Sequence, residues 1–163
     1  MEGDFTLEVT VEGVTPEEAT PKHAQLRKAF YSQGIVLFLD VKHFIRLEKA
    51  KTFPTAKQPI NYVNWEVVEQ GKFIKRGSFQ DFALTKDAPL SLKLERRQGS
   101  FIASVKSGDQ DWQKLKGMEA KFAEKCSVGL VASHTGNEGF TAKFSGLKLE
   151  QAEPKPEAAK TKE

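Results

Sequence analysis

Apolar and polar residues alternate along most of the chain with the period of two that is typical of β-strands. In Phe5 to Val11 every second residue is apolar. The nearly continuous apolar run Ile35 to Val41 is followed after a short link by His43 to Glu48, which predicts a hairpin through the core. Further strands are predicted at Ile60 to Glu69, Lys72 to Phe79, Leu90 to Arg97, Ser100 to Lys106, Cys126 to Ser133 and Gly139 to Leu149. The pattern therefore predicts an all-β sandwich or barrel.

Two connecting segments carry helical signals. Thr15 to Ala19 starts with a residue that can cap a helix, followed by proline and two acids, so it predicts a single helical turn. Met118 to Lys125 predicts a second short turn that covers one end of the sandwich. We expect both to be connections rather than functional elements.

The length of the chain and the composition of its last residues predict one folded domain. The 163 residues are enough for a single domain with a sizeable core. We expect residues 1–150 to form it, because residues 151–163 (QAEPKPEAAKTKE) contain no large apolar side chain and resemble a disordered linker or tail. The first and last strands share the patterns FTLEV and FTAKF, so we expect them to pair side by side.

The charges along the chain give no support to a nucleic-acid partner. The 25 Lys and Arg residues stand against 22 Asp and Glu, and the two signs are interleaved rather than gathered into a basic block. The chain shows no apolar run of membrane-spanning length and no secretory signal, so we expect no membrane span and, by default, a cytoplasmic location. The single cysteine, Cys126, lies among apolar residues and is expected to fill the core.

Four sequence blocks, taken in order, resemble the concanavalin-A-like jelly-roll family of lectin and glucanase modules. They are GDFTLEVTV, GIVLFLDVKHFIRLE, LSLKLERRQGSFIASVKSGDQDWQKL, and VGLVAS followed by GFTAKFSGLKLE. Within that family the chain is most similar to uncharacterised bacterial regulation-of-enolase-like domains, alongside laminin-G-like and sugar-binding accessory domains. The resemblance covers Gly3 to Glu150. It implies a two-sheet antiparallel sandwich with one curved sheet, whose ligands lie on the concave face or in the loops at its edge.

The two-residue period predicts which side chains face away from the core. In Ile60 to Glu69, for example, Trp65 falls in the core row and Glu66 in the outward row. If the strands are neighbours, their outward rows form one polar patch that contains an aromatic side chain. The predicted patch consists of Arg46, Glu48, Tyr62, Asn64, Glu66, Arg76, Glu95 and Arg97. His43 and His134 are predicted to lie at its rim.

The predicted patch is open to two interpretations. Amides and carboxylates pair with sugar hydroxyls, arginine donates as a fork, and Tyr62 offers a ring face to a pyranose, so the patch suits a carbohydrate. The same Arg and Glu side chains could instead form cross-strand ion pairs on a solvated sheet that binds nothing.

A catalytic version of this fold would place two carboxyls about 5 Å apart on one face. Neither Glu-x-Asp-x-x-Glu nor Glu-x-Asp-x-Glu occurs in the chain, and Glu66 and Glu69 fall on opposite faces of their strand. A cross-strand pair of Glu48 and Glu66 is geometrically conceivable, although both would more simply meet Arg46. Hydrolysis is therefore the weakest of the functions considered.

The sequence contains no metal-ligand motif, because its three histidines are isolated from one another and none has a metal-ligand spacing to cysteine or acid partners. Asp109, Asp111 and Asn137 are loop candidates for calcium, but they form no dense acidic loop. We predict no obligatory cofactor and leave calcium open.

Ser107 to Trp112 resembles the S-x-D-G-x-x-W turn of these modules, although it is shorter and lacks the central glycine. In that turn the aspartate caps the backbone and the tryptophan packs beneath it. A structural, half-buried Trp112 is therefore the main expectation, and stacking against a sugar is the alternative.

The sequence as a whole predicts a non-catalytic module that binds a carbohydrate or another polymer on the concave face. The alternative is a protein-interaction or structural domain of a larger assembly, tethered by the tail, and a glycoside hydrolase is the third hypothesis. The sequence names no particular sugar, protein partner or oligomeric state.

Overall fold

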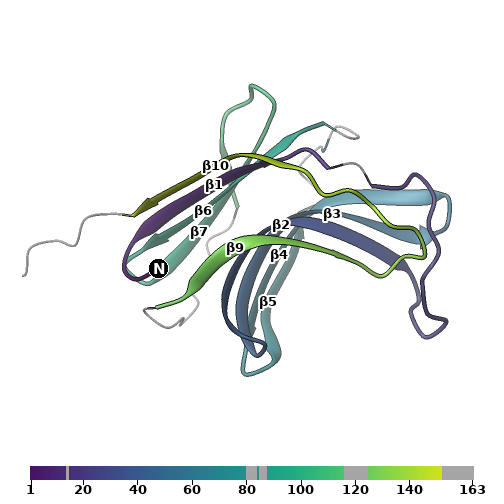
Figure 1. Cartoon of the computed structure of the whole chain (residues 1–163), viewed down its shortest axis with the longest axis horizontal. Coiled ribbons are helices and arrows are strands. Elements are labelled where there is room, and N and C mark those ends of the chain that lie inside the picture. The colour runs from purple at the N-terminus through teal and green to yellow at the C-terminus, as the bar shows by residue number, and fades with distance from the viewer. Residues whose placement is uncertain (14, 80–83, 85–87, 116–124, 152–163) are drawn as a thin grey trace, which may run out of the picture.

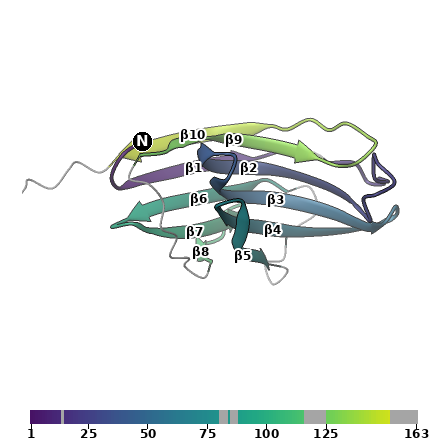
Figure 2. The same ribbon diagram turned by 90° about the horizontal axis from the view of Figure 1, so that it is seen from below.

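The computed structural model describes residues 1–13, 15–79, 84, 88–115 and 125–151, which form two antiparallel sheets of five strands each. The first sheet has the order β10-β1-β6-β7-β8 and consists of β1 (Phe5–Val11), β6 (Leu90–Arg97), β7 (Ser100–Ser107), β8 (Gln113–Lys114) and β10 (Phe144–Gln151). The second has the order β5-β4-β3-β2-β9 and consists of β2 (Ala29–Asp40), β3 (His43–Thr55), β4 (Gln58–Glu69), β5 (Lys72–Phe79) and β9 (Ser127–His134). The sheets form the two layers of a sandwich (Figures 1 and 2), so the predicted all-β architecture is confirmed.

The hydrophobic core lies between the two sheets, and one row of residues from each long strand supplies it. In β1, for example, Phe5, Leu7 and Val9 are buried, whereas the residues between them are partly exposed. Trp65 of β4 lies in the same core, as the alternation predicted. Burying one large apolar side chain stabilises a fold by roughly 1.5–3 kcal/mol, so the alternation decides which face of each strand turns inward.

β2 begins at Ala29, six residues before the predicted start at Ile35. Ser32 and Gln33 interrupt the apolar pattern, yet both are buried, and the backbone pairs with β3 along this whole stretch. Polar side chains that find partners inside the protein therefore extend the strand beyond its apolar run.

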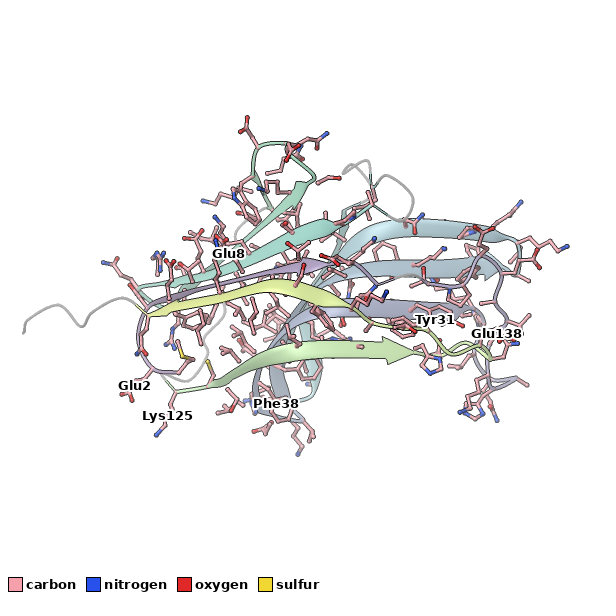
Figure 3. All side chains as sticks on the ribbon, turned by 45° about the horizontal axis from the view of Figure 1, so that its top comes forward. Glu2, Glu8, Tyr31, Phe38, Lys125 and Glu138 are labelled. Atoms are coloured by element: carbon pink, nitrogen blue, oxygen red, sulfur yellow. The ribbon has the colours of Figure 1, made fainter. Side chains whose placement is uncertain are left out.

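β10 begins at Phe144 rather than at the predicted Gly139, because the preceding loop packs around a tyrosine instead of pairing with a strand. The hydroxyl of Tyr31 donates a hydrogen bond to the carbonyl of Glu138 (2.9 Å), and Figure 3 shows the two residues beside each other. Phe140 packs edge-on against the same tyrosine ring, with 5.5 Å between the ring centroids.

The predicted helical turn at Thr15 to Ala19 is wrong, because these residues form no helix in the structure. Tertiary hydrogen bonds take the place of helical ones. The carbonyl of Pro16 accepts a bond from the Lys51 ammonium (2.8 Å), and the N–H of Ala19 donates to the carbonyl of Ala56 (3.1 Å).

Residues 118–124 of the second predicted turn lie outside the described residues. No helix that could cross a membrane is found in the described part of the chain.

The first and last strands are neighbours, as predicted. Phe5 lies opposite Gln151 in the antiparallel ladder, and Thr6 lies opposite Glu150. The last strand ends at Gln151, and the predicted domain boundary at residue 150 stays a prediction. Residues 152–163 of the predicted tail lie outside the described residues, so the tail stays a prediction.

Candidate functional site

The polar side chains predicted on β3 and β4 lie together on the outer face of the second sheet. Figure 1 shows the strands of this sheet arching so that the outer face is concave. Glu48 lies opposite Asn64 across the ladder, and Arg46 lies opposite Glu66. The residues between them point into the core, so the period of two aims all four polar side chains at the concave face.

The carboxylate of Glu48 is the centre of a hydrogen-bonded network on this face. Its Oε1 accepts a bond from the hydroxyl of Ser32 on β2 (2.8 Å), and its Oε2 accepts one from the Nδ2 of Asn64 on β4 (2.9 Å). Ser32 also hydrogen-bonds the hydroxyl of Ser133 on β9 (2.8 Å). The network thus ties together four neighbouring strands through side chains alone.

Arg46 is held by both carboxylates of the face. Its Nε donates to Oε2 of Glu66 (3.1 Å), its Nη2 bonds the same oxygen, and its Nε lies 3.8 Å from Oε2 of Glu48. The remaining nitrogen, Nη1, has no hydrogen-bond acceptor among the residues that the structure describes. The guanidinium is therefore fixed in position while keeping donor capacity.

Burial and neighbouring charges shift the pKa values of Glu48 and Arg46 in opposite directions. Loss of water around Glu48 raises the pKa of its carboxyl above the ordinary value, against the lowering effects of Arg46, Asn64 and Ser32. Burial also disfavours the charged form of Arg46, but the nearby carboxylates of Glu48 and Glu66 outweigh it and raise the pKa of the guanidinium. Arg46 therefore stays charged, and Glu48 binds its proton more tightly than an exposed glutamate does.

The outward-facing residues are buried to different extents, which the alternation alone did not predict. The side chain of Glu48 is 0% exposed and that of Glu66 is 4% exposed, whereas that of Arg46 is 22% exposed. Asn64 is buried and Tyr62 is partly buried. The carboxylates and the amide therefore form a supporting layer, and Arg46 and Tyr62 are the members that a ligand can reach.

Three predicted patch residues lie elsewhere or are only partly placed. Glu95 and Arg97 do not join the cluster, because β6 belongs to the first sheet and its outer face is on the other side of the sandwich. Arg97 instead donates to the carbonyl of Phe5 (3.1 Å) and the hydroxyl of Thr6 (2.8 Å). The backbone of Arg76 lies opposite Glu66 in the ladder, and its side chain is outside the described part of the structure.

Neither predicted rim histidine bonds a member of the cluster. His43 lies at the turn between β2 and β3, and its Nδ1 lies 3.0 Å from a carboxylate oxygen of Asp40. His134 lies opposite Tyr31 at the end of β9 and stacks on the tyrosine ring, with 5.6 Å between centroids. The two histidines therefore stabilise a turn and a loop at separate places in the second sheet.

Sequence reasoning missed Ser32, Ser133 and the role of Gly34. The signal was present in the sequence, because Ser32 and Gly34 continue the outward row of β2 at two-residue spacing. A Cβ at Gly34 would lie 2.1 Å from the backbone oxygen of Leu47, so β2 and β3 can approach this closely only because residue 34 has no side chain. The glycine thereby lets the backbone of β2 lie beside Glu48.

The described residues include no group of three or more His, Cys, Asp or Glu side chains arranged to hold a metal ion. Asp109, Asp111 and Asn137 belong to separate loops: the first two precede β8, and the third follows β9. The side chain of Asn137 instead accepts a hydrogen bond from the backbone of Thr20 (3.1 Å).

The sequence matches no protein-family model and none of the curated proteins, but the fold resembles solved structures. A functionally unknown protein from Saccharomyces cerevisiae superposes with a TM-score of 0.68 at 15% identity, over 94% of this chain and 72% of that one. A xylan β-1,4-xylosidase from Bacillus halodurans gives 0.54 at 13% identity, over 91% of this chain and 28% of the enzyme. A toad ovary galectin, solved in complex with N-acetylgalactose, gives 0.50 at 13% identity over 92% of each chain. These likenesses show the fold and confirm the concanavalin-A-like jelly-roll sandwich.

Proposed function

We propose that this protein is a module that binds carbohydrate on the concave face of its second sheet without transforming it. The proposal depends on one observation: two buried carboxylates hold Arg46 in place, and 22% of its side chain stays exposed. An arginine that is already fixed loses little side-chain entropy when it donates to a ligand hydroxyl. Tyr62 on the same strand face adds an amphipathic ring that can pack against a pyranose.

The likeness in fold supports a saccharide as the ligand class. One solved neighbour is a galectin in complex with N-acetylgalactose, and another is named for its action on xylan. Both are too distant in sequence to carry over any residue. The narrower resemblance to bacterial regulation-of-enolase-like domains stays a prediction, as does the cytoplasmic location.

The test is a glycan-array screen of the full chain, with and without calcium, followed by thermal unfolding of the protein with each glycan that binds. A ligand that binds only the folded state must raise the melting temperature as its concentration increases. We expect Tyr62→Ala to weaken binding about five- to tenfold, because one packed aromatic ring contributes on the order of 1 kcal/mol.

Arg97→Ala is the matched control, because it removes a polar side chain from the outer face of the other sheet. A screen in which no glycan raises the melting temperature would contradict the proposal. Glycan binding that Tyr62→Ala and Asn64→Ala leave unchanged would move the site away from this face. If the protein hydrolyses a bound glycoside and Glu66→Gln abolishes this turnover, the protein is a glycoside hydrolase rather than a non-catalytic binding module.

A protein-interaction role is the second candidate, and the hairpin tips of the second sheet favour it. Phe38 and Val41 near the β2–β3 turn are 41% and 78% exposed, and Phe73 after the β4–β5 turn is 56% exposed. The N–H of Gly71 donates to the carbonyl of Lys42 (2.9 Å), so the two tips lie side by side. A partner that binds there would be released by Val41→Asp and would not compete with free sugar.

A further inference from the structure

A pocket of about 190 Å³ lies on the outer face of the first sheet, on the opposite side of the sandwich from the concave face. Figure 3 shows Glu8, one of its lining residues, on the side of β1 that faces away from the second sheet. The lining residues are Glu8, Val9, Thr10, Ser91, Lys106, Trp112, Gly146 and Lys148. Drug-sized ligands occupy pockets from about 300 Å³ upward, so this pocket suits one small molecule.

An irregularity in β10 provides the room for the pocket. The pairing of β1 with β10 shifts register between Glu8 and Thr10, so β10 has more residues there than β1. Gly146 lies within this bulge with a φ of +59°, a left-handed conformation that favours glycine. Because residue 146 has no side chain, this part of the pocket stays open next to Thr10.

The pocket has a surplus of positive charge. The Nζ of Lys93 lies 2.8 Å from Oε1 of Glu8, so these two charges compensate each other. Lys106 and Lys148 also border the pocket, and neither ammonium has a carboxylate within 4.0 Å among the described residues. An anion in the pocket would therefore meet two ammonium groups that form no ion pair within 4.0 Å in the described structure, while Glu8, the acid that lines the pocket, is paired with Lys93.

Trp112 and two hydroxyls give the pocket the other features of a sugar site. The half-buried indole has the ammonium of Lys93 at 4.1 Å and that of Lys106 at 5.5 Å from its ring centroid. The hydroxyls of Thr10 and Ser91 lie 3.0 Å apart and bond each other, and each can form a further hydrogen bond. An apolar ring surface, hydroxyls and two cations thus surround one small volume.

We infer that this pocket binds a hexuronate, a sugar ring that bears a carboxylate, as a second site independent of the proposed function of the concave face. The carboxylate pairs with Lys106, which lies opposite Ser91 in the ladder and beside Trp112, and Lys148 on the other side of the pocket adds attraction at longer range. The ring packs beside Trp112, and the sugar hydroxyls bond Thr10 and Ser91. A neutral hexose would leave both lysines without a counter-charge, and a bare anion would leave the indole and the hydroxyls without a partner.

The test is a titration of the full chain with D-galacturonate at low ionic strength, followed by indole fluorescence and calorimetry. Trp65, the other tryptophan, is 1% exposed in the core, so a fluorescence change reports on Trp112. Binding is expected to saturate and to be at least about tenfold tighter than that of D-glucose, because ionised hydrogen bonds are roughly twice as strong as neutral ones. It is also expected to weaken as salt is added.

The double variant Lys106→Gln/Lys148→Gln is expected to lose at least about tenfold in galacturonate affinity. Its melting temperature is expected to stay close to that of the native protein, because Lys148 is exposed and Lys106 is partly exposed. Lys57→Gln, a lysine whose side chain is 78% exposed on another part of the molecule, is the matched control and is expected to bind as tightly as the native protein.

Any of three results would overturn the inference: no saturation with galacturonate, equal affinity for glucose, or equal affinity for potassium sulfate. Asn64→Ala on the concave face is expected to leave galacturonate binding unchanged, so the two sites can fail separately.

Discussion

Gly34 shows how the absence of one side chain supports the concave face. A Cβ at this position would lie 2.7 Å from the Cα of Glu48 and 2.1 Å from the oxygen of Leu47, and both are backbone atoms that cannot rotate away. Any other residue at position 34 must push β2 and β3 apart in the row that holds Glu48.

Gly34→Ala is therefore expected to lower the free energy of unfolding by about 3 kcal/mol, the upper part of the range for overpacked sites. Urea unfolding measures this. Gly129→Ala is the matched control in the same sheet, because its Cβ would lie 4.0 Å from the nearest atom, a methyl of Val36. The control is expected to change stability by about 0.5 kcal/mol or less. Equal losses in the two variants would show that the close approach at Gly34 does not matter.

Glu48 makes the stability of the protein depend on pH. Its pKa is raised in the folded state because burial disfavours the carboxylate, so the folded state binds the proton more tightly than the unfolded state. The stabilisation from this group is fully present below the pKa of the unfolded state and is lost as the pH rises through the raised pKa.

The variant Glu48→Gln has no carboxyl group to titrate at this position. Between the pKa of Glu48 in the unfolded state and its raised pKa in the folded state, we therefore expect the free energy of unfolding of the variant to change less with pH than that of the native protein. Urea titrations of both proteins in steps from pH 4 to pH 8 measure the two slopes. Identical slopes would show that Glu48 titrates in the folded protein as it does in the unfolded chain.

At the scale of the strands, Arg97 connects β6 to the strand beside it. Its guanidinium donates to the carbonyl of Phe5 and the hydroxyl of Thr6 on β1, and pairs with Glu95 at 3.0 Å. The side chain is 42% exposed, so solvent weakens these contacts.

Arg97→Ala is expected to cost about 1 kcal/mol of stability and to leave glycan binding unchanged. Thermal unfolding and the array measure the two effects, with Arg27→Ala, another exposed arginine, as the control for lost charge. If Arg97→Ala instead left stability unchanged and abolished glycan binding, Arg97 would belong to the carbohydrate site.

The alternation of residues predicted the faces of strands but not the sheet to which each strand belongs. Arg46 and Glu66 could be placed together because β3 and β4 are consecutive and joined by a short turn. Glu95 and Arg97 were misplaced because the chain changes sheets between β5 and β6, and a period of two is the same in either sheet. The burial of Glu48 depends on the curvature of the sheet and on side chains from β2 and β4, which no local pattern encodes.

At the scale of the whole molecule, Cys126 reports on the opening of the sandwich. It is 5% exposed within the main core, and burial raises the pKa of its thiol. Because the thiolate is the reactive form, both effects slow its reaction with thiol reagents in the folded state.

Labelling of native protein with a disulfide reagent at pH 8 is expected to be at least about 100-fold slower than in 8 M urea, since it requires the core to open. Absorbance of the released thiol follows the reaction. Equal rates would place Cys126 at the surface.

The pairing of β1 with β10 also determines how the sandwich responds to mechanical force. Phe5 and Gln151 form the outermost pair of an antiparallel ladder, so traction applied at these two residues pulls directly on one end of it. The hydrogen bonds between β1 and β10 would then break sequentially from this end of the ladder, whereas a force along the strands would load all of them at once. Force applied in this direction is expected to peel β10 from the edge of its sheet before it disturbs the core.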